Sequence, residues 1–87
     1  MKIKSRKKFN KHFRKLPRKL QVLVSKKLLL FKKDPFHPSL KNHALHGQMQ
    51  HLRAISITRN IRIIFEEYDN YAIVLMLDIG SHNRLYE

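Results

Sequence analysis

Six histidines and one arginine inside an apolar segment are the residues of this chain best suited to chemistry. The histidines occupy positions 12, 37, 43, 46, 51 and 82, and Arg62 interrupts an aliphatic run. Histidine exchanges protons near neutral pH, and the planar guanidinium of arginine matches the oxygens of a phosphate. Cleavage of RNA through its own 2′-hydroxyl needs a base for that hydroxyl, an acid for the leaving 5′-oxygen and a cation for the developing charge. These residue types therefore fit the requirements of RNA cleavage.

His82 and Arg62 each allow two interpretations. His82 follows Gly80 by two positions at the end of an apolar segment, so a rigid strand would aim its ring, although the same position suits a histidine that only caps the strand. Arg62 carries a desolvation cost inside an aliphatic strand unless it is paired or reaches an anion. Asp78 and Glu66 are carboxylates that could pair with it, and a bound phosphate is the alternative.

Metal binding and nucleophilic catalysis are less well supported. His43, His46 and His51 lie close in sequence, but their spacing matches no recognised zinc pattern, and no cysteine or well-placed carboxylate completes a ligand set. Ser81 and His82 are neighbours on an extended chain, so their side chains point apart. The chain has no cysteine, which excludes disulfides and thiolate nucleophiles. We therefore expect no metal and no cofactor.

The charge of the chain indicates the kind of partner. Nineteen Lys and Arg against six Asp and Glu give a formal charge of +13 over 87 residues. Such an excess favours a polyanionic partner, namely RNA, DNA, an anionic membrane or an acidic protein. The longest apolar run, residues 71–77, is too short to span a bilayer, and the charged N-terminal residues do not resemble a signal peptide. We therefore expect a cytoplasmic protein that does not associate with a membrane.

Three segments have the pattern of β-strands and must position Arg62 and His82. They comprise residues 51–58, 61–68 and 71–79, and shorter strands are predicted at residues 1–4 and 43–46. The last two long segments flank Asp69-Asn70, a pair that favours a tight turn, so they predict a β-hairpin. Residues 51–58 alternate between two sides, as a strand requires.

The face on which Arg62 lies depends on the register of these strands. If both connecting turns contain two residues, Arg62 lies opposite Ile57 on one neighbour and Leu77 on the other, and it shares a face with Ile55. A slip of one residue moves Arg62 to the opposite face, and the sequence alone does not decide between the two registers.

Apolar residues at helical spacing predict two helices before the sheet. The first follows Ser5, a suitable N-cap, and the second begins at Pro17 and ends before Asp34. Their apolar positions are Phe9, Phe13 and Leu16 in the first helix, and Leu20, Leu23, Val24, Leu28 and Phe31 in the second. We therefore predict an α+β fold in which residues 1–87 form a single domain, with two N-terminal helices packed on a twisted antiparallel sheet of three to four strands.

Three motifs in the chain are similar to those of a known family. They are DPFHPSLKNHALHG at residues 34–47, ITRNIRIIFEE at residues 57–67 and LDIGSHNRLY at residues 77–86. In this order they resemble the RelE/ParE superfamily of bacterial toxins from type II toxin–antitoxin pairs, and within it the YafQ-like and RelE/StbE-like branch. The last motif is the most specific, since the family pattern is a hydrophobic strand, Gly, a small residue, His and a terminal aromatic residue.

The resemblance implies a ribosome-dependent messenger RNA endonuclease that an acidic antitoxin protein keeps silent. By position, His82 looks like the C-terminal acid or base, Arg62 like the strand arginine at the scissile phosphate, and His43 like a second active-site histidine. Tyr86 looks like the aromatic residue that contacts a base of the RNA, and Arg53 corresponds to a basic or aromatic position beside them. Partners implied are mRNA, ribosomal RNA, the ribosome and the antitoxin.

Two further residues complete the predicted substrate-binding set, and two departures from the family pattern accompany them. Ser56 stands where members often have another histidine, and it is assigned with His46 to substrate binding. Asn60-Ile61 stands where members often have Asp-Trp. Two other functions remain open, a ParE-like toxin that acts on DNA gyrase without nuclease activity and a non-toxic module that binds RNA or the ribosome. The Gly-x-His motif together with the strand arginine favours the nuclease.

Overall fold

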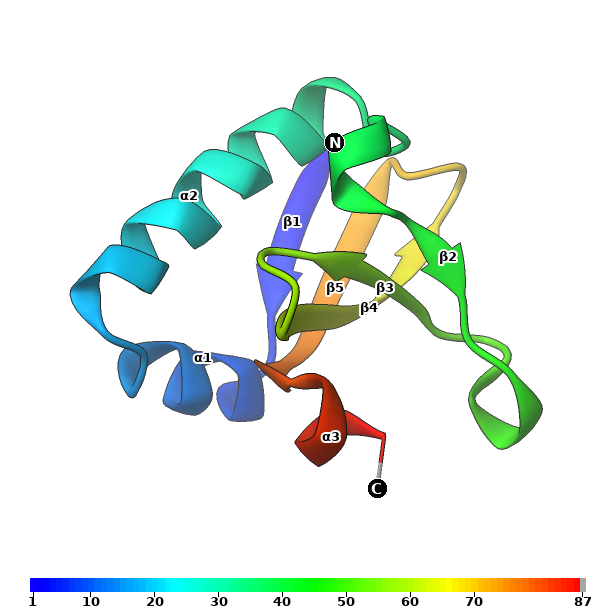
Figure 1. The fold of residues 1–87 in the computed structure, drawn as a ribbon. Helices are drawn as coiled ribbons and strands as arrows, with labels where there is room; N and C mark the ends of the chain where they lie inside the picture. Colours follow the sequence, from blue (N-terminus) through cyan, green and yellow to red (C-terminus); the bar gives the residue numbers. More distant parts are fainter. Residues whose placement is uncertain (87) are drawn as a thin grey trace.

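A computed structural model describes residues 1–86. A twisted sheet lies at its centre, with two long helices on one side and irregular segments on the other (Figure 1). In chain order the elements are β1 (Lys2–Ser5), α1 (Lys7–Arg14), α2 (Arg18–Lys33), η1 (Pro38–Leu40), β2 (His43–Ala44), η2 (Gly47–Met49), β3 (Arg53–Ser56), β4 (Ile61–Tyr68), β5 (Ile73–Ser81) and α3 (His82–Leu85), where η marks a short 3₁₀ helix.

The sheet has five strands in the order β1-β5-β4-β3-β2. The α+β class and the two N-terminal helices are confirmed, but the predicted antiparallel sheet of three to four strands is wrong. β1 pairs in parallel with β5, so the sheet is mixed. The physical reason is the connection: α1 and α2 carry the chain across the sheet after β1, and such a crossover is what parallel pairing requires. The C-terminal helix α3 was not predicted.

Of the two registers that the sequence left open around Arg62, the structure has the one that places this residue on the face opposite to Ile55. Arg62 lies opposite Ser56 on β3 and opposite Gly80 on β5. The loop between β3 and β4 is wider than a two-residue turn, because the amide of Ile57 already donates to the carbonyl of Ile61. A register shift also interrupts the β4–β5 ladder between Ile64 and Phe65. Arg62 therefore projects from the face of the sheet opposite to the one that carries Ile55.

The two faces of the sheet are covered differently. The face that we call the helix-covered face packs against α1 and α2, and its buried cluster comprises Phe9, Val24, Phe31, Leu40, Ile55, Ile57, Ile63, Phe65, Val74, Met76 and Ile79. The opposite face, here the loop-covered face, holds a smaller cluster of Leu45, Ala54 and Ile64, packed against Met49, Leu52, Leu77, Leu85 and Tyr86. Residues 45–52 and α3 supply this thinner cover.

The sequence signals predict both ends of α2 correctly and the N-cap of α1 incorrectly. Pro17 immediately precedes α2, and Asp34 follows its last residue, as predicted. The predicted N-cap of α1 is wrong, because Arg6 occupies that position and makes no side-chain cap, while the hydroxyl of Ser5 donates to Asn10. A helix of eight residues without a cap is held mainly by packing, here through Phe9.

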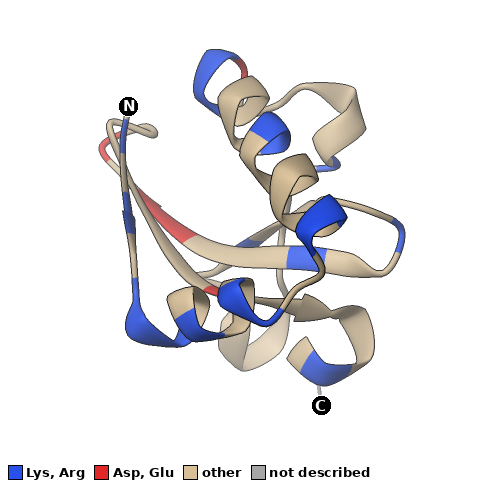
Figure 2. Ribbon diagram, turned by 90° about the vertical axis from the view of Figure 1, so that its left-hand side faces the viewer, with Lys and Arg blue, Asp and Glu red and all other residues tan. Residues whose placement is uncertain are grey.

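Charged residues are distributed unevenly over the fold. Lys and Arg lie along both long helices, whereas acidic residues gather toward the turn of the β4–β5 hairpin (Figure 2), where Glu66, Glu67 and Asp69 stand. The opposite end of the hairpin leads into α3. Over residues 1–86, none of the helices combines the length and the apolar character needed to cross a membrane.

Candidate active site

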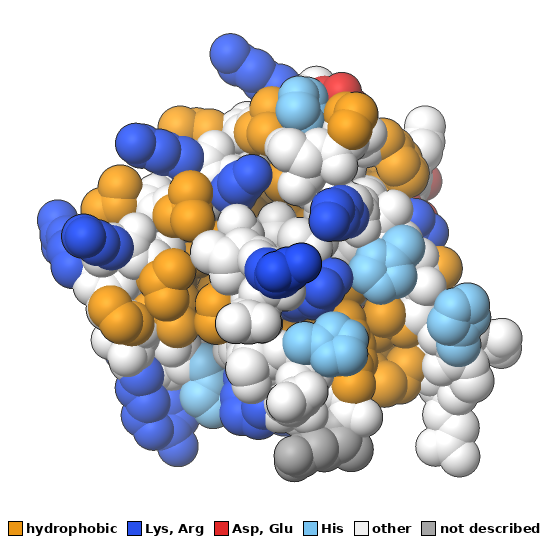
Figure 3. Space-filling view, viewed as in Figure 1, with side chains coloured by type: hydrophobic (Ala, Val, Ile, Leu, Met, Phe, Trp, Pro, Cys, Tyr) orange, Lys and Arg blue, Asp and Glu red, His pale blue; other side chains and the backbone are white. Residues whose placement is uncertain are grey.

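Four of the residues singled out in the sequence line one pocket on the loop-covered face. His43 and His46 come from β2 and the segment after it, and His82 and Tyr86 come from α3 and its C-cap. The pocket has a volume of about 460 Å³, and Leu45 and Met49 complete its lining. Histidine and basic side chains gather on this side of the molecule around an apolar hollow (Figure 3). The sheet thus brings together residues separated by some forty positions in the chain.

His82 and Tyr86 are held against each other by α3. The Ser81 hydroxyl caps this short helix by accepting from the amide of Arg84 (3.3 Å), and the amide of His82 donates to the carbonyl of Asn60 (2.8 Å). The rings of His82 and Tyr86 meet edge to face with centroids 4.5 Å apart. The imidazole of His82 remains exposed to solvent. Its position therefore depends on α3 and on the tyrosine ring, and it stays accessible to a ligand.

His43 is oriented by the backbone. Its Nδ1 lies 2.8 Å from the carbonyl oxygen of Lys41. Because a carbonyl only accepts hydrogen bonds, Nδ1 must carry the proton. Neutral His43 therefore presents an unprotonated Nε2, which is the form that a general base needs.

Arg62 is anchored without a carboxylate. Its Nη1 donates to the hydroxyl of Ser56 (3.0 Å) and its Nη2 donates to the carbonyl of Arg59 (3.3 Å). Neither of the partners expected from the sequence, Asp78 or Glu66, is within ion-pair distance in residues 1–86. Its positive charge is therefore not neutralised by these acids. Such a site suits an anion.

A second hollow extends around Arg62. It has a volume of about 300 Å³ and is lined by Ser39, Lys41, Ser56, Ile57, Thr58, Arg59 and Arg62. Lys41 lines this hollow, and its carbonyl accepts a hydrogen bond from His43, which lines the histidine pocket. Residues 41–43 therefore connect the two hollows. Three basic side chains, those of Lys41, Arg59 and Arg62, thus lie beside the histidine pocket. The sequence pattern did not identify Lys41 or Arg59, which lie in loops.

Two buried polar atoms in this region have no hydrogen-bond partner within residues 1–86, namely Nε of Arg62 and the hydroxyl of Tyr86. Burial raises the pKa of Tyr86, and the charge of Arg62 acts in the opposite direction. The hydroxyl is protonated at neutral pH, as in any tyrosine, so it can donate. Buried polar groups are normally satisfied, so their exceptions mark places where water or a ligand would bind.

The remaining predicted residues have clear positions. Ser56 is buried and accepts from Arg62, so its contact is with the arginine side chain. Arg53 does not join the histidine pocket. Its Nε donates to the side-chain oxygen of Asn42 (2.8 Å), and its guanidinium lies 5.6 Å from the ring centroid of Phe36. β3 directs its side chain, like that of Ile55, away from the loop-covered face.

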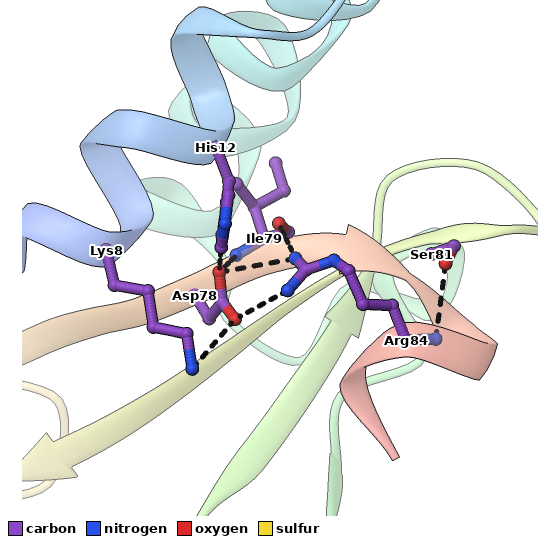
Figure 4. Close-up of polar contacts among 6 residues, drawn as sticks. All are labelled: Lys8, His12, Asp78, Ile79, Ser81 and Arg84. Atoms are coloured by element: carbon purple, nitrogen blue, oxygen red, sulfur yellow. Dashed lines mark hydrogen bonds and ion pairs between the residues drawn. The ribbon is translucent and has the colours of Figure 1, made fainter. Parts of the chain in front are cut away.

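A cluster around Asp78 was missed from the sequence. This buried carboxylate contacts Lys8, His12 and Arg84 on the side of β5 that faces α1 (Figure 4). Asp78 was considered only as a partner for Arg62, and Arg84 only as part of the C-terminal motif. The partners of Asp78 lie 66 to 70 positions earlier in the chain on α1 and six positions later on α3, a pairing for which the sequence offers no signal.

No group of three or more His, Cys, Asp or Glu side chains that could hold a metal ion occurs within residues 1–86. The chemistry that the described residues offer is therefore that of two histidines for proton transfer, basic side chains for an anion and an aromatic ring for stacking. Fold and site together define a class: small basic α+β proteins with a helix pair on a five-stranded sheet and a C-terminal histidine.

The sequence matches, over residues 1–87, the family model described as the bacterial toxin of type II toxin–antitoxin systems, YafQ. The chain belongs to this family, which confirms the resemblance to the RelE superfamily. Among curated protein sequences, none matches the chain.

Solved structures of similar fold are also toxins. A copper-bound mutant toxin from Helicobacter pylori is 26% identical, with a TM-score of 0.73 and 99% of each chain covered. YafQ from E. coli strain BL21(DE3) is 17% identical, with a TM-score of 0.72 and coverage of 98% of this chain and 97% of that one. The toxin–antitoxin complex RelBE2 from Mycobacterium tuberculosis is 12% identical, with a TM-score of 0.77 and coverage of 93% and 96%.

Proposed function

We propose that this toxin is a metal-independent endoribonuclease that inhibits translation by cleaving messenger RNA on the ribosome. The observation that carries the proposal is the shared pocket of His43, His82 and Tyr86 beside a basic hollow around Arg62. Toxins of the family to which the chain belongs are generally ribonucleases. Two histidines that line one pocket match the acid and base that attack by a 2′-hydroxyl requires.

Each residue has a distinct role in the proposed reaction. Nε2 of His43 accepts the proton of the 2′-hydroxyl, because Nδ1 is engaged with the Lys41 carbonyl. His82, which is exposed beside Tyr86, donates a proton to the leaving 5′-oxygen. Arg62 stabilises the negative charge that develops on the phosphoryl oxygens, with its guanidinium held by Ser56 and the Arg59 carbonyl.

Tyr86, His46 and Ser56 complete the proposed site. The Tyr86 ring, which packs edge to face with His82, supports a base of the RNA by stacking. His46 lies on the rim of the same pocket and contacts the RNA chain. Ser56 acts through Arg62, which it holds in place. Arg53 stands apart from this group and serves the packing around Asn42 and Phe36.

The proposed partners follow from charge and from family membership. A formal charge of +13 suits ribosomal and messenger RNA, whose phosphates attract the basic residues of α1 and α2. An acidic antitoxin would neutralise the same surface, and the solved RelBE2 complex offers a precedent for a toxin of this fold bound to its antitoxin. The proposal therefore assigns the protein to the cytoplasm, where these partners occur.

The proposal is tested with His82→Ala, His43→Ala and a control, His51→Ala, in which an exposed histidine outside the pocket is removed. Programmed ribosomes are incubated with each variant, and new 5′ ends are mapped by primer extension. Loss of a positioned acid or base slows cleavage by about 10²- to 10⁴-fold, so we expect this for the first two variants and no change for the third. A His82→Ala variant as active as His51→Ala would contradict the proposal, and inhibition of gyrase by the parent without RNA cleavage would favour the ParE-like function.

A further inference from the structure

Asp78 is a buried carboxylate bound by cations from two helices. Its Oδ1 lies 2.6 Å from Nδ1 of His12 on α1, and its Oδ2 lies 3.2 Å from Nη1 of Arg84 on α3 and 3.7 Å from Nζ of Lys8 (Figure 4). The amide of Ile79 also donates to Oδ1 (2.8 Å). Burial alone would raise the pKa of Asp78, but the hydrogen bonds from His12, Arg84 and this amide outweigh it and hold the pKa below its ordinary value.

Arg84 reaches Asp78 by lying across Gly80. Its Nη2 donates to the carbonyl of Ile79 (2.5 Å) and lies 3.4 Å from Oδ1 of Asp78. A Cβ placed on Gly80 would overlap the guanidinium of Arg84. The backbone of Gly80 has no unusual dihedral angle that would itself demand glycine. The close approach of the arginine side chain is therefore the reason that this strand position has no side chain.

The helix that Arg84 anchors also carries the proposed acid. A four-residue helix is not stable alone, since helices shorter than about 12 residues are marginal in water even with favourable sequences. α3 must therefore be held by its contacts with the sheet. Leu85 and Tyr86 provide apolar contacts on the loop-covered face, and Arg84 provides the polar contact to β5 on the other side of the helix. His82, the exposed first residue of α3, is therefore positioned by these contacts.

We propose that the contact of Arg84 with Asp78, here the Asp78–Arg84 clamp, fixes α3 on the end of β5 and thereby positions His82 and Tyr86 for reaction. The inference rests on the proposed function. Arg84 is a positioning residue, because it acts through His82. His12 and Lys8 extend the clamp to α1, so that the first helix and the last helix of the chain are joined at one carboxylate. The side chain of Arg84 has this structural partner, whereas that of Arg62 is left for the substrate.

A double-mutant cycle tests the clamp. Gly80→Ala and Arg84→Gln should each slow cleavage of ribosome-bound message by about tenfold to a hundredfold, because a displacement of about 1 Å at a reacting group costs that much. In an Arg84→Ala background, Gly80→Ala should cost less than about twofold more, since the group that it displaces is already absent. The matched control is Arg6→Gln, which removes an equal charge from an exposed residue between β1 and α1 and should leave cleavage unchanged.

A second measurement reports geometry without activity. The ring protons of His82 lie beside the Tyr86 ring, so their NMR signals are shifted by its ring current, and His82→Ala identifies them. We expect Arg84→Gln and Gly80→Ala to move these signals toward the position of an unpacked histidine, with the signals of His37 and His51 unchanged. If Arg84→Gln does not fold, as judged by loss of dispersion at all histidines, Gly80→Ala carries the test because every charged group remains in it.

The possible results separate the clamp from the proposed function. Unshifted His82 signals and parental cleavage in Gly80→Ala and Arg84→Gln would overturn the clamp and leave the function standing. An equal cost of Gly80→Ala in both backgrounds would also overturn it, since the effect would then not pass through Arg84. A parent that does not cut RNA would refute the function, while the NMR signals would still decide whether Arg84 holds the His82–Tyr86 pair.

Discussion

The two faces of the central sheet differ in how completely they are covered. On the helix-covered face, eleven buried side chains form one cluster under α1 and α2. On the loop-covered face, three buried side chains support a thin cover made by residues 45–52 and α3. The two buried polar atoms without partners, on Arg62 and Tyr86, both belong to the second region. In this fold, the helix-covered face contributes most of the buried core, and the loop-covered face carries the histidine pocket.

Replacement of Phe31, on the helix-covered face, should cause the largest loss of stability among these variants. Phe31 is fully buried and meets Phe65 edge to face with centroids 5.2 Å apart. We expect Phe31→Ala to lower the free energy of unfolding by about 3–5 kcal/mol, measured by urea denaturation. Leu29→Ala on the same helix is the control, because Leu29 is 63% exposed and should cost less than about 0.5 kcal/mol. Equal losses of unfolding free energy in the two variants would show that the buried side of α2 does not contribute to the core.

Replacement of Arg62 by lysine, on the loop-covered face, should slow RNA cleavage without lowering the stability of the fold. Lysine keeps the charge but loses the planar fork that donates to Ser56 and that, in the proposed reaction, binds a phosphate. We expect Arg62→Lys to slow RNA cleavage by about tenfold to a hundredfold in a single-turnover assay. The control is Arg18→Lys, away from the site. If Arg62→Lys cleaved at the parental rate, charge alone would be sufficient at this position.

The smallest effect should distinguish two tyrosine hydroxyls. The Tyr86 hydroxyl is buried without a partner within residues 1–86, whereas the Tyr71 hydroxyl accepts from Asn42 (3.0 Å). Tyr86→Phe should therefore raise the free energy of unfolding by about 0.5–1 kcal/mol, and Tyr71→Phe should lower it by about 0.5–1.5 kcal/mol. Urea denaturation of both variants gives the comparison. A loss of the same size in both would mean that the Tyr86 hydroxyl is already satisfied by solvent.

Elements whose signals are local could be predicted from the sequence, and pairings between distant segments could not. The apolar spacing around Phe31 predicted α2, and the alternation around Ile55 predicted β3. The register of Arg62 could not be decided from the sequence because it depends on loop widths: the connection from Tyr68 to Ile73, with positive φ angles at Asp69 and the two residues after it, is longer than a two-residue turn. The parallel pairing of β1 with β5 has no local signature at all.

The same distinction applies to the site. The C-terminal motif indicated His82 and Tyr86, and the structure places both in one pocket with His43. The motif could not indicate that Arg84 lies over Gly80, because a side chain's path across a strand depends on the face to which it is directed. The separation of Arg53 from the pocket likewise follows from the alternation of β3, on which Arg53 and Ile55 share a side.

The parallel pairing of β1 with β5 has a consequence for the order of assembly. Lys2 pairs with Ile73, so the strand that is synthesised first must wait for the strand that is synthesised last of the five. Contacts between segments so distant form late and slowly, since the loop entropy is lost before they contribute. α1 shares this delay, because it packs on β5. A ribosome making this chain therefore carries an unfinished sheet and no His82 until synthesis has passed β5, and the proposed site stays incomplete for the same period.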